Sequence, residues 1–81
     1  MLYTVYVLED EKGKKYEGIT NDLKRRLLEH RSGNTTTTRR MRGEPKVLYV
    51  ENFSTFEEGR KREFYLKTAA GRRFLKRMLE G

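Results

Sequence analysis

The sequence predicts an α+β domain, with a small three-stranded and mostly antiparallel sheet flanked by helices in the order ββαβαα. Residues 2–8 and 14–19 are rich in β-branched and aromatic residues and flank a short polar segment, a pattern typical of a hairpin. Residues 46–50 return to strand composition, whereas three other segments carry apolar residues at helical spacing. No repeat or linker divides the 81 residues, so we expect one domain over 1–81.

The hairpin is predicted to bring two tyrosines together. In residues 2–8, alternation places Val5 and Val7 on one face of the strand and Tyr6 on the other. The polar segment 9–13 ends in glycine and can form the loop before the second strand begins. Tyr16 in the second strand can therefore lie near Tyr6.

The first helix is expected over residues 22–31. Asn21 is a good N-cap residue, Asp22 favours the positive end of the helix dipole, and Gly33 ends the run. Two more helices follow the last strand. The second opens on a capping-box pattern at residues 55–58 and runs to about residue 67, and Gly71 is expected to break it from the third, which carries an apolar stripe of Phe74, Leu75, Met78 and Leu79.

The charge of the chain indicates a polyanionic partner. Nineteen lysines and arginines outnumber 12 acidic residues and give a net charge of +7. Nucleic acid is the first partner to expect and an anionic membrane surface the second. Residues 32–45 lack periodic apolar positions and read as an exposed basic loop. The residues expected to hold backbone phosphates are Arg25, Arg39, Arg40, Arg42, Lys67, Arg72, Arg73 and Lys76.

The residues that are missing exclude several kinds of site. No cysteine is present, so the chain can have no disulfide, thiolate zinc site or cysteine nucleophile. A single histidine excludes a multi-histidine metal cluster, and any metal would be a hard cation such as Mg²⁺ bound by oxygen. No apolar stretch approaches a membrane span and no signal-peptide layout is present, so we expect a cytoplasmic protein without membrane attachment. With no heptad pattern, we expect a monomer.

Several short motifs occur in order along the chain. Thr4-Val5-Tyr6 is followed by Tyr16-Glu17-Gly18, then by Arg26 and His30 on the first helix, and by Glu63 on the second. In this order and at this spacing the motifs resemble the GIY-YIG nuclease family, and more closely its small stand-alone bacterial members. The resemblance covers nearly the whole chain.

Two positions depart from the family pattern. Thr4 stands where the first motif usually has glycine, and Glu17 stands where the second motif usually has an apolar residue. Alternation places Glu17 on the opposite face of its strand from Tyr16, where an unpaired buried carboxylate would be costly without a lysine or arginine partner. At a sheet edge, Glu17 could instead reach water or pair with Lys15.

The resemblance implies a metal-dependent DNA endonuclease. It implies that Glu63 holds a single Mg²⁺ or Mn²⁺, that Arg26 clamps the scissile phosphate, and that Tyr16 orients or deprotonates the attacking water with Tyr6 in support. His30 is an alternative proton acceptor, because an imidazole ordinarily has a pKa of about 6.5. The sequence leaves the choice between Tyr16 and His30 open.

Simpler interpretations exist for the same residues. Glu63 has Lys67 four residues later and could form an ordinary helix salt bridge, while Arg25 competes with Arg26 for the phosphate. No element is long enough to read a major groove, so we expect structure-directed or weakly sequence-specific cleavage of DNA, for example of branched, nicked or single-stranded forms. The alternative functions are a non-catalytic nucleic-acid-binding module on the same scaffold and a basic protein-interaction domain.

Overall fold

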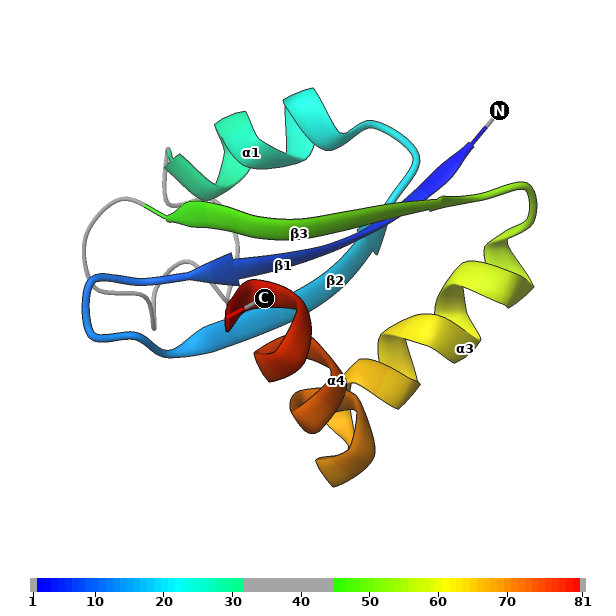
Figure 1. Cartoon of the computed structure of the whole chain (residues 1–81). Helices are drawn as coiled ribbons and strands as arrows, with labels where there is room; N and C mark the ends of the chain where they lie inside the picture. Colours follow the sequence, from blue (N-terminus) through cyan, green and yellow to red (C-terminus); the bar gives the residue numbers. More distant parts are fainter. Residues whose placement is uncertain (1, 32–44, 81) are drawn as a thin grey trace.

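The fold is a three-stranded antiparallel sheet with one helix on one face and two helices on the other (Figure 1). The structure is a computed structural model that describes residues 2–31 and 45–80. The strands are β1 (Tyr3–Glu9), β2 (Lys15–Thr20) and β3 (Lys46–Phe53), and the helices are α1 (Leu23–Arg31), α3 (Phe56–Lys67) and α4 (Ala69–Glu80). The α+β class and the order ββαβαα are confirmed. Within the described ranges, no helix is long and apolar enough to cross a membrane.

The strand order β2-β1-β3 makes β1 the central strand, and its side chains are buried on both faces of the sheet. On one face, Val5 and Val7 pack with Leu66 of α3 and Leu75 of α4. On the other face, Tyr6 and Leu8 are covered from the side of α1 by Leu23 and Leu27. The small core is therefore built in two layers around a single strand.

The register of the hairpin decides which side chains share a face. Tyr6 lies opposite Gly18 and Leu8 lies opposite Tyr16, so both tyrosines project from the same face of the sheet. Val7 lies opposite Glu17, which places Glu17 on the face covered by α3 and α4. The expected alternation of the hairpin is confirmed.

The break between the last two helices lies at Thr68, so the expectation that Gly71 makes the break is wrong. Thr68 has an extended backbone and its hydroxyl accepts the Gly71 N–H at 3.1 Å, so this side chain caps the first turn of α4. Gly71 lies inside α4 and is buried against the end of α3. The predicted apolar stripe is only partly covered, since Leu75 is buried whereas Met78 and Leu79 are exposed.

Replacing Gly71 by alanine is expected to destabilise the fold by about 3 kcal/mol. A Cβ atom at Gly71 would overlap the carbonyl oxygen of Tyr65 and lie 2.5 Å from the Cα of Leu66, and the backbone cannot give way cheaply. Gly59→Ala is the matched control, because the one close contact of its Cβ, at 2.5 Å, would be the terminal methyl of the flexible Ile19 side chain. Urea unfolding should show a much smaller loss for Gly59→Ala, and equal losses would contradict this account of the helix junction.

Candidate functional site

A polar pocket of about 310 Å³ lies where β1, β2, α1 and α3 meet, along the β2 edge of the sheet. All five residues predicted to be catalytic line it: Tyr6, Tyr16, Arg26, His30 and Glu63. They come from four different elements, so only the folded chain brings them together. The remaining lining residues are Leu8, Glu17, Gly18, Ile19, Arg60 and Lys67.

The hydroxyl of Tyr6 connects the two α1 residues of the pocket. It accepts a hydrogen bond from Nε of Arg26 at 3.4 Å, and it lies 3.4 Å from Nε2 of His30. The Tyr6 side chain lies against Gly18, where a Cβ atom would overlap its hydroxyl and Cζ. The glycine of the second motif is therefore needed to let the Tyr6 side chain extend across β2 into the pocket.

The two neighbouring arginines of α1 have different surroundings. Arg26 lines the pocket and bonds to Tyr6, whereas the side chain of Arg25 is 65% exposed and pairs with Glu29. The hydrogen bond to Tyr6 raises the pKa of Arg26 further, and a hydrogen bond to Glu29 adds to this. Arg26 thus keeps a full positive charge within the pocket.

His30 is held neutral near pH 7. The residue is 2% exposed, and burial lowers its pKa below the ordinary value of 6.5, with the charge of Arg26 lowering it further and Glu29 opposing both. A neutral imidazole can accept a proton. The position of His30 four residues after Arg26 aims both side chains at the same tyrosine.

Proton NMR should show that His30 titrates below pH 6.5, and the signal is unambiguous because the chain has one histidine. Since the folded pKa lies below the unfolded one, the unfolded state binds more protons in the window between them. Stability should therefore fall as the pH is lowered through about 6.5 and level off below the folded pKa. Arg26→Gln should raise the pKa of His30, and a midpoint at or above 6.5 in the unaltered protein would contradict the account.

Tyr16 has a different partner, which the sequence did not single out. Its hydroxyl donates to Oδ2 of Asp10 at 3.4 Å. The other oxygen of Asp10 accepts the backbone N–H groups of Lys12 and Lys14, each at 2.9 Å, so Asp10 also fixes the hairpin loop. An aspartate at the first position of a polar loop was the available signal. The hydroxyl of each pocket tyrosine therefore lies within hydrogen-bonding distance of another side chain, His30 for Tyr6 and Asp10 for Tyr16.

Glu63 lies at the pocket wall with its side chain only 8% exposed. Oε2 lies 3.2 Å from Nζ of Lys67, and Oε1 lies 3.5 Å from a guanidinium nitrogen of Arg60 but accepts no hydrogen bond from the described residues. The expected helix salt bridge to Lys67 is present, yet one buried oxygen still accepts no hydrogen bond from residues 2–31 or 45–80. Such an oxygen suits a hard divalent cation.

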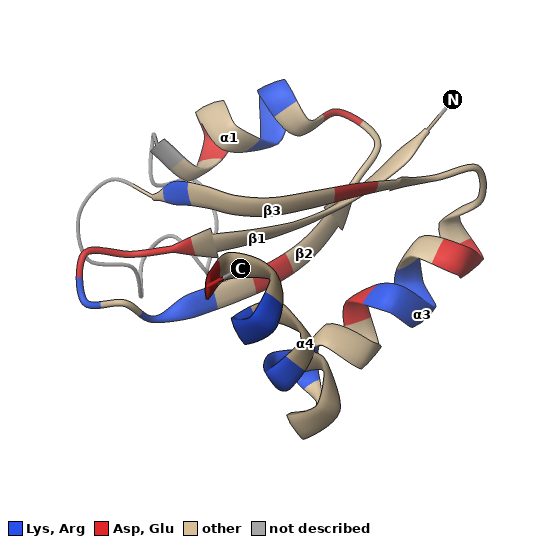
Figure 2. Ribbon diagram, viewed as in Figure 1, with Lys and Arg blue, Asp and Glu red and all other residues tan. Residues whose placement is uncertain are grey.

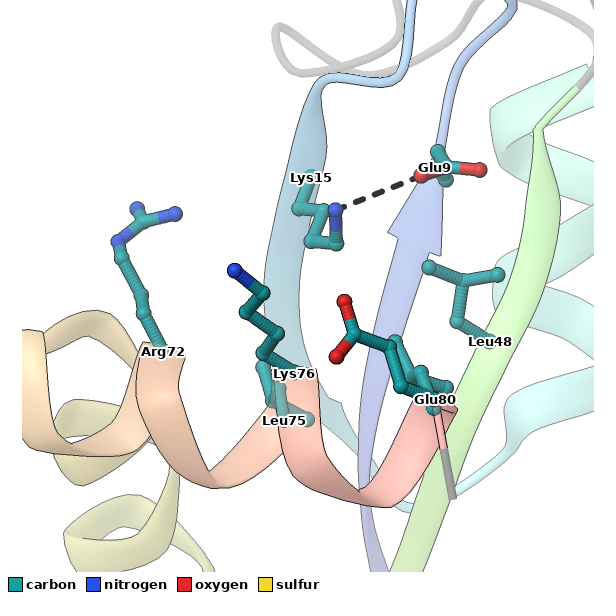
Figure 3. Close-up of a pocket in the computed structure, with 8 residues that line it drawn as sticks. Glu9, Lys15, Leu48, Arg72, Leu75, Lys76 and Glu80 are labelled. Atoms are coloured by element: carbon teal, nitrogen blue, oxygen red, sulfur yellow. Dashed lines mark ion pairs between the residues drawn. The ribbon is translucent and has the colours of Figure 1, made fainter.

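Glu17 is buried rather than solvated. Lys15 pairs with Glu9 at 3.4 Å instead of with Glu17 (Figure 3). The Glu17 side chain is 5% exposed, and its Oε1 lies 3.9 Å from a guanidinium nitrogen of Arg72 in α4. That oxygen accepts no hydrogen bond from the described residues.

The residues predicted to hold phosphates are dispersed. Lysines and arginines are spread over α1, α3 and α4 (Figure 2). Lys67 lines the polar pocket and Arg25 and Arg73 are exposed, whereas residues 39, 40 and 42 lie outside the described part of the chain. Arg72 and Lys76 line a second pocket of about 490 Å³ with leucines at its base (Figure 3). That pocket is larger, but it holds none of the predicted catalytic residues.

Comparison with known proteins points to one family. The GIY-YIG catalytic domain model matches residues 2–76. A UPF0213 protein of Staphylococcus saprophyticus is 30% identical over 77 residues, covering 95% of this chain and 94% of that protein. Another from Bacillus pumilus is 40% identical over 63 residues, covering 78% of this chain and 64% of that protein. The solution NMR structure of a UPF0213 protein from Bacillus halodurans aligns with a TM-score of 0.60 at 30% identity, covering 96% of this chain and 85% of that chain.

Proposed function

Because the chain belongs to the GIY-YIG catalytic domain family, a family of nucleases, we propose that it is a metal-dependent DNA endonuclease whose active site is the polar pocket along β2. The observation that carries this proposal is the convergence of Tyr6, Tyr16, Arg26, His30 and Glu63 in one pocket. A non-catalytic binding module would not require a charged arginine, a neutral histidine and a buried carboxylate around one space.

Arg26 binds the scissile phosphate in this proposal. Its guanidinium stays ionised and its fork matches two phosphate oxygens, so it neutralises the charge that develops during hydrolysis. Nε of Arg26 donates to the Tyr6 hydroxyl, and this hydrogen bond orients the guanidinium group. The two terminal nitrogens are left for phosphate and for Glu29.

His30 accepts the proton of the attacking water, through Tyr6. An ordinary phenol has a pKa of about 10 and an imidazole about 6.5, so a neutral imidazole is the better acceptor near neutral pH. As the Tyr6 hydroxyl passes its proton to Nε2 of His30, the same oxygen can take one from water. Tyr16, which donates to Asp10, orients the water from the other side of the pocket.

Glu63 holds the single Mg²⁺ or Mn²⁺. When bound there, the ion would neutralise phosphate charge and lower the pKa of bound water. Lys67 and Arg60, which pair with Glu63 here, have side chains 44% and 50% exposed and can turn toward phosphate oxygens instead. Because the dispersed basic residues suit backbone contacts, we propose DNA of distorted or branched form as the substrate, bound by a monomer with little sequence preference.

The test is cleavage by the purified protein of plasmid, branched and single-stranded DNA, with and without Mg²⁺ or Mn²⁺. Cleavage that requires the cation and is lost in Glu63→Gln supports the proposal. Equal cleavage by both proteins would indicate contamination and refute the role of Glu63, and DNA binding without cleavage under any condition would favour the binding module.

A further inference from the structure

Glu17 and Glu63 line the same pocket, and each has a buried carboxylate oxygen that accepts no hydrogen bond from the described residues. The side chains of Glu17 and Glu63 are 5% and 8% exposed. In each, Oε1 is buried and accepts no hydrogen bond from residues 2–31 or 45–80. Both residues line the polar pocket. A buried ionised carboxylate is costly unless it is compensated, so a bound cation would suit this pair.

The fold places the two carboxylates on one side of the sheet. Glu17 lies opposite Val7 in the hairpin, and Val7 packs against Leu66 of α3. Glu63 precedes Leu66 by about one helical turn, so its side chain lies on the same buried side of α3. Glu17 thus approaches the pocket from the edge strand and Glu63 from the helix that covers it.

The cationic side chains around the two carboxylates are much more exposed than the carboxylates are. Lys67, Arg60 and Arg72 lie 3.2, 3.5 and 3.9 Å from a carboxylate oxygen, with side chains 44%, 50% and 56% exposed. These three side chains reach out to solvent and can rotate away at small cost. The two carboxylates are fixed by burial. A cation can therefore replace the three side chains, which are then available for the phosphates of a substrate.

We propose that Glu17 is a second carboxylate ligand of the divalent cation, so that Glu17 and Glu63 form a two-carboxylate site. Mg²⁺ and Mn²⁺ prefer hard oxygen ligands and keep several waters, which suits a site with two protein carboxylates. The proposal rests on the proposed metal-dependent function and adds a ligand at a position where the family motif usually has an apolar residue. It also accounts for a charged residue of β2 whose side chain is buried.

The experiment is a titration of the DNA-free protein with Mn²⁺ alone, in which electron paramagnetic resonance measures the concentration of the free ion. Glu17→Gln and Glu63→Gln should each weaken Mn²⁺ binding by about tenfold or more, since each removes one charged ligand. Arg72→Gln should leave the affinity unchanged or increase it, because it removes a competing positive charge from Glu17. Glu57→Gln, an exposed position in the first turn of α3, is the matched control and should bind as the unaltered protein does.

Thermal unfolding without metal separates a ligand from a structural residue. Glu17→Gln should unfold at the same or a higher temperature than the unaltered protein, and Mn²⁺ should raise that temperature less. A lower unfolding temperature with unchanged Mn²⁺ affinity would overturn the proposal by making Glu17 the structural partner of Arg72. Loss of binding in Glu63→Gln alone would also overturn it and leave the nuclease proposal standing. DNA cleavage by a protein that binds no Mn²⁺ would overturn both.

Discussion

Replacing Glu63 by glutamine is expected to lower the rate of DNA cleavage by about three orders of magnitude or more, while the protein remains folded. Glutamine keeps the size of the side chain but removes the charge that would hold the divalent cation. The ion-pair partners Lys67 and Arg60 are both about half exposed, so the substitution leaves no buried cation unpaired and the free energy of unfolding should not fall sharply. Single-turnover cleavage and urea unfolding measure the two effects on the same preparation.

The control for Glu63→Gln is Glu57→Gln on the same helix, where the side chain is exposed. It should cleave at the rate of the unaltered protein. If Glu63→Gln retained more than about a tenth of the activity, the carboxylate would be one half of the salt bridge to Lys67 and nothing more.

Replacing Arg26 by alanine is expected to lower kcat by about a thousandfold. The guanidinium lies in the pocket against Tyr6 and its charge is needed most when phosphate charge develops, so the loss should fall mainly on kcat and only weakly on KM. Steady-state cleavage of one labelled oligonucleotide over a range of concentrations separates the two constants.

Arg25→Ala is the matched control, because Arg25 is the neighbouring arginine on α1 and also pairs with Glu29. It should change KM by no more than a few-fold and leave kcat unaltered. Arg26→Lys should recover only part of the rate, since lysine keeps the charge and loses the fork. Similar losses from Arg25→Ala and Arg26→Ala would show that the sequence register of the motif had chosen the wrong residue.

The hairpin and the start of α3 could be predicted because their signals are local. Alternation within the strands and the short loop between them predict that Tyr6 and Tyr16 lie close together, and the pattern of residues 55–58 locates the beginning of α3, where the Thr55 hydroxyl accepts the N–H of Glu58 at 3.2 Å. The end of α3 at about residue 67 was predicted correctly, but the break before α4 was placed at Gly71 instead of Thr68, because a glycine can either end a helix or allow two helices to pack closely. Gly71 allows the first turn of α4 to lie close to the end of α3, and this contact depends on how the two helices pack.

The site was predicted from the order of the motifs, and the sequence could not show what surrounds each residue. The choice between Arg25 and Arg26 depends on where Tyr6 points, and Glu17 meets Arg72 of α4 rather than the nearby Lys15. Such partners are distant along the chain and no local pattern encodes them. The resemblance to the GIY-YIG family predicted which residues form one site, and hydrophobic periodicity alone does not predict this.

The two-layer core has a consequence for how the site can open. Tyr6 belongs to the central strand, which is buried on both faces and should exchange its amide hydrogens only when the whole domain unfolds. Arg26 and His30 belong to a nine-residue helix that is attached to this strand by Leu23, Leu27 and the two contacts with Tyr6. Local opening of α1 would carry the phosphate clamp and the proton acceptor away together, and leave the carboxylates in place on the sheet and α3. If the proposed nuclease function holds, DNA cleavage should be lost at a lower denaturant concentration than the one that unfolds the sheet.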